Sequence, residues 1–89
     1  MIHDQRDEIE ALIAQVALGN QDAFSRLYDA TNGKLLAVCM RVLSERAAAE
    51  DAMQEVYVKV WKNAGRYQVM GHSPMTWLIT VARNTAIDR

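Results

Sequence analysis

The chain has 89 residues, 51% of them hydrophobic and one of them proline, a composition that excludes a disordered segment and leaves room for one domain. No apolar run of eighteen residues and no basic N-terminal leader before an apolar segment occur, which excludes a membrane span and a secretory signal. The net charge of −1 excludes a uniformly basic surface, and the single cysteine, Cys39, excludes an internal disulfide. We expect residues 1–89 to form one all-α domain, a compact bundle of four helices, in the cytoplasm.

The first two helices are predicted from apolar residues at helical spacing. Asp4 is expected to cap the first helix and Gly19 to end it, while Asn20 or Asp22 begins the second. The segment Thr31–Gly33 is expected to bend the second helix. The residues expected to face the core are Ile9, Leu12, Ile13 and Val16 of the first helix and Phe24, Leu27, Tyr28, Leu35, Val38, Cys39 and Val42 of the second.

The last two helices have clearer start signals. The third is expected to begin at Ser44 and the Ala47–Ala49 run and to stop at Gly65. After a short loop, Ser73–Pro74 supplies an N-cap and a proline at the first helical position, and the last helix runs to Arg89 without a stop signal. Their expected core residues are Met53, Val56, Tyr57 and Val60 of the third helix and Trp77, Leu78, Val81 and Ala82 of the fourth.

Charge is distributed unevenly along the chain. Residues 1–55 contain ten acidic residues against five basic ones, whereas residues 56–89 contain five basic residues against one acidic residue. A basic end can bind phosphate while an acidic end binds a basic protein. Uneven surface charge without a function is the alternative interpretation.

One face of the third helix opposes its apolar face. The residues on this face are Asp51, Glu55, Val58 and Lys62, with Gln54 beside them. Asp51 and Glu55 are like charges four residues apart, which costs an isolated helix roughly 0.2–0.5 kcal/mol and which a basic partner would turn into attraction. The alternative is an ordinary solvated face on which Glu55 pairs with Lys59.

Aromatic and cationic residues alternate from the end of the third helix onward. They are Trp61, Lys62, Arg66, Tyr67, His72, Trp77 and Arg83, and the polar Asn84 follows them. Single-stranded nucleic acid is bound in this way, with bases stacked on rings and cations along the backbone. The alternative is that Trp77 belongs mainly to the core. The opposite stripe of the last helix is polar and nearly free of acid, as in a helix that faces DNA, and consists of Thr76, Thr80, Arg83, Asn84 and Ile87.

Catalytic and metal-binding functions have little support in the sequence. His3 and His72 have no spacing that suggests a shared metal, and Cys39 lies on an apolar stripe with no histidine nearby in sequence. No glycine loop for phosphate and no Glu-x-x-His pair for a di-iron site is present. We expect no enzyme activity, no catalytic residues, no bound metal and no cofactor.

The segment Ala49–Trp61, with its acidic pair, Gln54-Glu55, an aromatic, a basic residue and a tryptophan, closely resembles region 2 of extracytoplasmic-function (ECF) sigma factors. Asp22–Tyr28 is similar to the opening helix of that family, and Trp77–Arg89 is similar to its promoter-reading helix. The resemblance covers residues 20–89 and implies a bacterial transcription initiation factor with the helical fold of sigma region 2.

The resemblance also implies roles for particular residues. Asp51, Gln54 and Glu55 match residues that bind the coiled-coil clamp helices of the β′ subunit of core RNA polymerase. The segment from Arg66 to Ser73 matches the loop that receives a flipped base of the non-template strand of the promoter minus-ten element. The residues that match the helix beside this loop are Thr76, Thr80, Arg83 and Asn84.

The resemblance implies further partners and leaves alternatives open. An anti-sigma factor is an expected partner, and a second domain with a helix-turn-helix, which is absent from residues 1–89, is expected in the longer protein. A bundle that binds only proteins, as an adaptor or anti-sigma-binding module, would use the same acidic and apolar faces. A four-helix metal or redox protein would need ligands that the sequence lacks.

Overall fold

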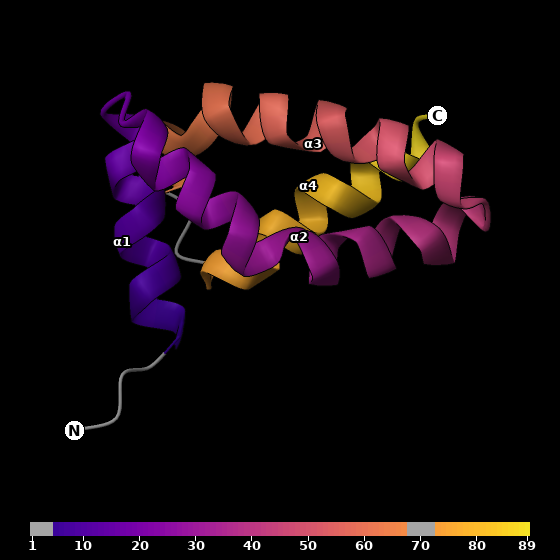
Figure 1. Ribbon diagram of the computed structural model, residues 1–89, viewed down its shortest axis with the longest axis horizontal. Helices are drawn as coiled ribbons and strands as arrows, with labels where there is room; N and C mark the ends of the chain where they lie inside the picture. Colours follow the sequence, from indigo (N-terminus) through magenta and orange to yellow (C-terminus); the bar gives the residue numbers. More distant parts are fainter. Residues whose placement is uncertain (1–4, 68–72) are drawn as a thin grey trace.

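The computed structural model describes the chain from Gln5 to Tyr67 and from Ser73 to Arg89, and the side chains from Glu8 onward within it. The helices in these ranges are α1 (Gln5–Ala17), α2 (Gln21–Leu43), α3 (Arg46–Tyr67) and α4 (Pro74–Ile87) (Figure 1). The predicted all-α bundle of four helices is therefore confirmed over the described part of the chain. Asp4 and the predicted loop of residues 68–72 lie outside the described residues.

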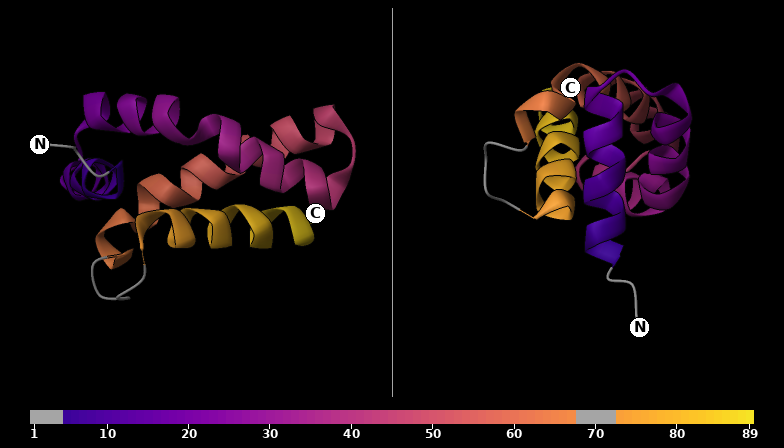
Figure 2. Two further views of the ribbon diagram at one scale, coloured as in Figure 1. Left: turned by 90° about the horizontal axis from the view of Figure 1, so that it is seen from below. Right: turned by 90° about the vertical axis from the view of Figure 1, so that its left-hand side faces the viewer.

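The helices α2, α3 and α4 run along the length of the molecule, and α1 crosses one end of it (Figures 1 and 2). α2 and α3 are consecutive and joined by only Ser44 and Glu45. α1 lies at the end of the bundle where α3 finishes and α4 begins, whereas α4 finishes near the start of α3 (Figure 1). This arrangement brings both α1 and α4 into contact with α3, whose exposed face was predicted to be functional.

Local capping signals explain where α2 and α4 begin. The Asn20 side chain accepts a hydrogen bond from the Ala23 N–H at 3.0 Å, so Asn20 and not Asp22 is the N-cap of α2. Gly19, just before it, has a φ of +86°, which glycine adopts without strain. Ser73 caps α4 by accepting from the Thr76 N–H at 3.2 Å, and Pro74 occupies the first turn, as predicted.

Three predicted helix boundaries were wrong. Ser44 ends α2 instead of starting α3, since its φ is +60° and its N–H donates to the Met40 carbonyl at 2.9 Å. α3 continues past Gly65 to Tyr67, because the neighbouring Ala64 and the final Tyr67 are buried in the core. α4 ends at Ile87, two residues before the predicted end.

The core confirms most of the predicted apolar faces. Two residues predicted to face inward are instead exposed on α2, since Tyr28 is 45% and Val42 38% accessible. The predicted bend at Thr31–Gly33 does not interrupt α2, and Thr31 is buried, with its hydroxyl donating to the Leu27 carbonyl at 2.7 Å. The fully buried side chains include Ile9, Ile13, Leu27, Leu35, Cys39, Val56, Val60 and Leu78.

A buried hydrogen bond joins α2 to α3. The Thr31 and Tyr57 hydroxyl oxygens are 2.6 Å apart, and both residues are buried. Because the single Thr31 hydroxyl proton already points to Leu27, the Tyr57 hydroxyl donates and Thr31 accepts. Among the described side chains, no buried polar atom lacks a partner. No helix in the described ranges is long and apolar enough to cross a membrane.

Candidate functional site

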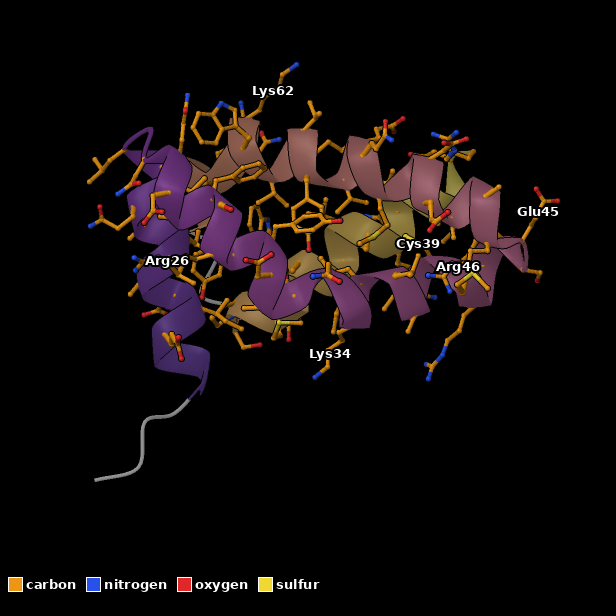
Figure 3. The ribbon with its side chains drawn as sticks, viewed as in Figure 1. Arg26, Lys34, Cys39, Glu45, Arg46 and Lys62 are labelled. Atoms are coloured by element: carbon orange, nitrogen blue, oxygen red, sulfur yellow. The ribbon has the colours of Figure 1, made fainter. Side chains whose placement is uncertain are left out.

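The predicted face of α3 is exposed along its length. Asp51, Gln54, Glu55 and Lys62 are all exposed, and Val58 is 51% accessible. Figure 3 shows Lys62 extending outward from α3, away from α2 and α4. The face therefore presents two carboxylates and an amide toward its N-terminal half and a cation toward its C-terminal half, as the helical spacing predicted.

Glu55 has intramolecular partners, whereas Asp51 does not. The Glu55 carboxylate pairs with Lys59 Nζ at 3.4 Å and with Arg89 Nη1 at 3.5 Å, and the Lys59 Nζ also donates to Thr85 Oγ1 at 3.1 Å. These contacts join α3 to the end of α4. Among the side chains that the structure describes, Asp51 has no ionic or hydrogen-bonding partner. Its carboxylate is therefore available to a basic partner without breaking an internal contact.

A groove of about 570 Å³ lies beside the acidic residues, between α2 and α3. It is lined by residues of both helices, namely Tyr28, Asn32 and Leu36 of α2 and Arg46, Ala47, Glu50, Asp51, Met53, Gln54 and Tyr57 of α3. The groove was not predicted from the sequence, because Tyr28 was expected to face the core. Tyr28 is instead half-exposed and forms one side of the groove, and its ring centroid is 4.8 Å from that of Tyr57. Asp51 and Gln54 thus lie at the border between the exposed face of α3 and a groove with both polar and apolar walls.

The predicted polar face of α4 is also exposed. Thr76, Thr80, Arg83 and Asn84 all lie at the surface, and their neighbours Leu78 and Ala82 are fully buried. The Thr80 hydroxyl donates to the Thr76 carbonyl at 2.8 Å. Within the described ranges, the Arg83 and Asn84 side chains have no partner, so their donors are free to bind phosphate or a base edge.

The predicted aromatic and cationic cluster is only partly assembled at the surface. Lys62 and Arg66 are exposed, and His72 lies outside the described residues. Tyr67 is only 4% accessible, because its ring packs against Trp77 at 5.5 Å between centroids and its hydroxyl donates to Glu10 at 3.1 Å. The Tyr67 ring is therefore not available for base stacking in this conformation, contrary to the expectation from the sequence. Trp77 is half-buried.

A second aromatic group, which includes Trp61, lies between α2 and α3. The Trp61 ring is 5.2 Å from Phe24 in an edge-on arrangement, and 36% of the residue remains accessible. Phe24 also contacts Tyr57 at 6.1 Å. Trp61 therefore packs mainly against the bundle and has only its outer part at the surface.

Cys39 is buried between α2 and α4 (Figure 3). Burial raises the pKa of its thiol, and Sγ lies 3.8 Å from the Ala82 carbonyl, to which it donates. A thiol of this kind is a poor nucleophile. Within the described ranges, no three His, Cys, Asp or Glu side chains lie close enough together to hold a metal ion.

Comparison with known proteins gives a family for this chain. The family model described as Sigma-70 region 2 matches residues 27–89. The ECF RNA polymerase sigma factor SigK of Mycobacterium ulcerans is 39% identical over 83 residues, which are 93% of this chain and 44% of that protein. The SigK of Mycobacterium tuberculosis (strain ATCC 25177 / H37Ra) is 37% identical over 82 residues, 92% of this chain and 44% of that protein. The chain thus spans less than half the length of these curated relatives.

Proposed function

The chain belongs to the Sigma-70 region 2 family, and from this we propose that it acts in bacterial transcription initiation, binding core RNA polymerase with α3 and the promoter minus-ten element with α4. The family consists of transcription initiation factors and not of enzymes. This function places the protein in the cytoplasm beside polymerase. An anti-sigma factor that covers α3 or α4 would block one of the two activities.

The acidic face of α3 supports polymerase binding. Asp51, Gln54 and Glu55 match the residues by which sigma factors bind the clamp helices of β′, and all three are exposed on one face. The unpaired Asp51 is the single observation that carries the proposal most strongly, because an exposed carboxylate at the edge of a groove with both polar and apolar walls suits an amphipathic basic helix. A basic side chain of the clamp would pair with Asp51 while an apolar neighbour enters the groove beside Tyr28 and Met53.

The polar face of α4 supports capture of unpaired bases. Arg83 and Asn84 present free donors, and Thr76 and Thr80 add hydroxyl groups on the same exposed side. Lys62 and Arg66 add two exposed cations near the end of α3. Because Tyr67 is buried, hydrogen bonds and phosphate contacts carry this binding, and Trp77 offers a partly accessible ring beside the α4 face. Few cations take part, so binding by the domain alone is weak and sensitive to salt.

Two binding measurements with the wild-type chain test the two halves of this function. The first measures affinity for a coiled-coil fragment of β′ by calorimetry. The second measures affinity for fluorescent minus-ten oligonucleotides as non-template strand, template strand and duplex. We expect clamp binding and a preference for the non-template strand. Clamp binding without any oligonucleotide preference, even in assembled holoenzyme, would instead identify a module that binds only proteins. Equal affinity for duplex and single strand would refute base capture.

A further inference from the structure

The helix α1 lies at the end of the bundle where the chain leaves α3 and enters α4 (Figures 1 and 2). The match to the family model begins at Leu27, so α1 lies outside it. Ile9, Ile13 and Val16 anchor α1 in the core. The outer side of the same helix carries exposed acidic residues, Glu8 and Glu10, of which only Glu10 is hydrogen-bonded to another helix among the described side chains.

Glu10 accepts a hydrogen bond from the last residue of α3. The Tyr67 hydroxyl donates to Glu10 Oε2 at 3.1 Å. The Tyr67 ring is buried and packs against Trp77, in the first turn of α4, with the two ring planes at 46°. The hydrogen bond fixes one end of the Tyr67 ring and Trp77 covers its side, so α1, α3 and α4 are connected in series through three side chains.

The position of Trp77 matters for the exposed face of α4. Trp77 directly follows Thr76 and precedes Thr80 by three residues. A change in the packing of Trp77 would therefore reorient the start of α4, which carries the hydroxyl groups of Thr76 and Thr80. We propose that Glu10 is a positioning residue, which holds Tyr67 against Trp77 and thereby sets the orientation of the α4 face for single-stranded DNA. This proposal rests on the base capture proposed above.

The experiment uses the chain of 89 residues with Trp61→Phe, which leaves Trp77 as its only tryptophan. In this background we compare Glu10→Ala, Glu10→Gln, Tyr67→Phe and the double variant Glu10→Ala/Tyr67→Phe. Glu8→Ala is the matched control, since it removes an exposed carboxylate from the same helix. The readouts are the emission of Trp77, the affinity for the minus-ten non-template oligonucleotide, and the affinity for the β′ clamp fragment.

Glu10→Ala and Tyr67→Phe should each shift the Trp77 emission and weaken oligonucleotide binding by about two- to tenfold, the effect of one lost hydrogen bond. The double variant should be no worse than either single variant, because both changes remove the same contact. Glu10→Gln retains an acceptor and should restore both readouts, which a loss of α1 packing would not allow. The affinity of every variant for the β′ clamp fragment should equal that of the parent chain. The Glu8→Ala control should equal the parent chain in all three readouts.

Two results would overturn the role of Glu10 alone. The first is a Trp77 emission that does not respond to Glu10→Ala, and the second is an oligonucleotide affinity that stays unchanged while the parent chain binds. Failure of the parent chain to bind any minus-ten strand, alone and within holoenzyme, would overturn base capture and this proposal together. Additive effects in the double variant would show that Glu10 and Tyr67 act through separate contacts and would also overturn it.

Discussion

The exposed faces of α3 and α4 offer different chemistry to their partners. The α3 face has carboxylates at Asp51 and Glu55 next to a groove with polar and apolar walls, whereas the α4 face has hydroxyl groups, one amide and one cation at Arg83. A surface of the first kind binds a basic amphipathic helix through charge and apolar burial together. A surface of the second kind binds through hydrogen bonds that depend on direction. The two binding activities should therefore respond separately to substitution.

The largest difference between the effects on clamp binding and on oligonucleotide binding is expected at Asp51. Asp51→Lys replaces an unpaired carboxylate with a cation that faces a basic partner, and we expect β′ clamp binding to weaken by about 1–3 kcal/mol. Oligonucleotide binding should stay constant or rise slightly, since the substitution adds positive charge. Calorimetry with the clamp fragment measures the loss, and circular dichroism confirms that α3 is intact. Unchanged clamp affinity would remove the α3 face from the polymerase interface.

At Arg83 and Asn84 the opposite is expected, with oligonucleotide binding weakened and clamp binding retained. Either Arg83→Ala or Asn84→Ala should weaken binding of the minus-ten non-template strand by about 1 kcal/mol, because each removes an exposed donor without disturbing the core. The Arg83 variant alone should also reduce the salt dependence of binding. Fluorescence anisotropy at several salt concentrations distinguishes the two. Lost clamp binding in either variant would show that the α3 and α4 faces are not separate.

The buried Tyr57 hydroxyl beneath the α3 face should contribute to the stability of the fold. Burial raises the pKa of Tyr57 to about 12. In the unfolded chain Tyr57 loses its proton near pH 10, at a lower pH than in the folded chain. The free energy of unfolding therefore falls as the pH rises from about 10 to about 12. Tyr57→Phe should lower stability by about 1 kcal/mol at neutral pH and remove this part of the fall.

Urea titrations at pH 8 and pH 11 measure both effects, and Tyr28→Phe, at a half-exposed tyrosine, is the matched control. An equally steep fall above pH 10 in the Tyr57→Phe variant would contradict the assignment. Loss of clamp or oligonucleotide binding at neutral pH would show instead that Tyr57 contributes directly to an interface.

The smallest effect is expected where the two faces meet. Glu55 pairs with Lys59 and with Arg89 at the end of α4, so polymerase must compete with internal cations for its carboxylate. Glu55→Gln should therefore weaken clamp binding by only a few tenths of a kcal/mol, less than Asp51→Asn. Calorimetry with both variants checks the order. A larger loss at Glu55 would mean that Glu55 exchanges its internal partners for polymerase without cost.

Sequence periodicity predicted the exposed faces better than it predicted the details of the helices. The four helices, the Asn20 and Ser73 caps and the exposure of the α3 and α4 faces all follow from local pattern. Gly65 was predicted to end α3, because a pattern contains no information about the tertiary packing of Ala64 and Tyr67 on either side of it. Tyr28 was predicted to be buried for the same reason. Its surroundings depend on how α2 crosses α3.

The positions of the candidate site residues were predicted to different degrees. Asp51, Gln54 and Glu55 follow from helical spacing and from family resemblance, and their exposure agrees with both. The burial of Tyr67 did not follow, since its ring contacts Trp77 and its hydroxyl donates to Glu10, which lies 57 residues earlier in the chain. The groove beside Asp51 was also missed, because a groove is formed by two helices and is not encoded in the period of either one.

The hydrogen bond between Thr31 and Tyr57 has a consequence for the entropy of binding. It fixes the axial position of α2 on α3, because sliding either helix by one turn would leave a buried hydroxyl without a partner. Tyr57 also forms part of the groove wall. The groove therefore has its shape before any partner binds. The entropy cost of ordering its side chains, which weakens many interfaces, belongs here to folding and not to binding.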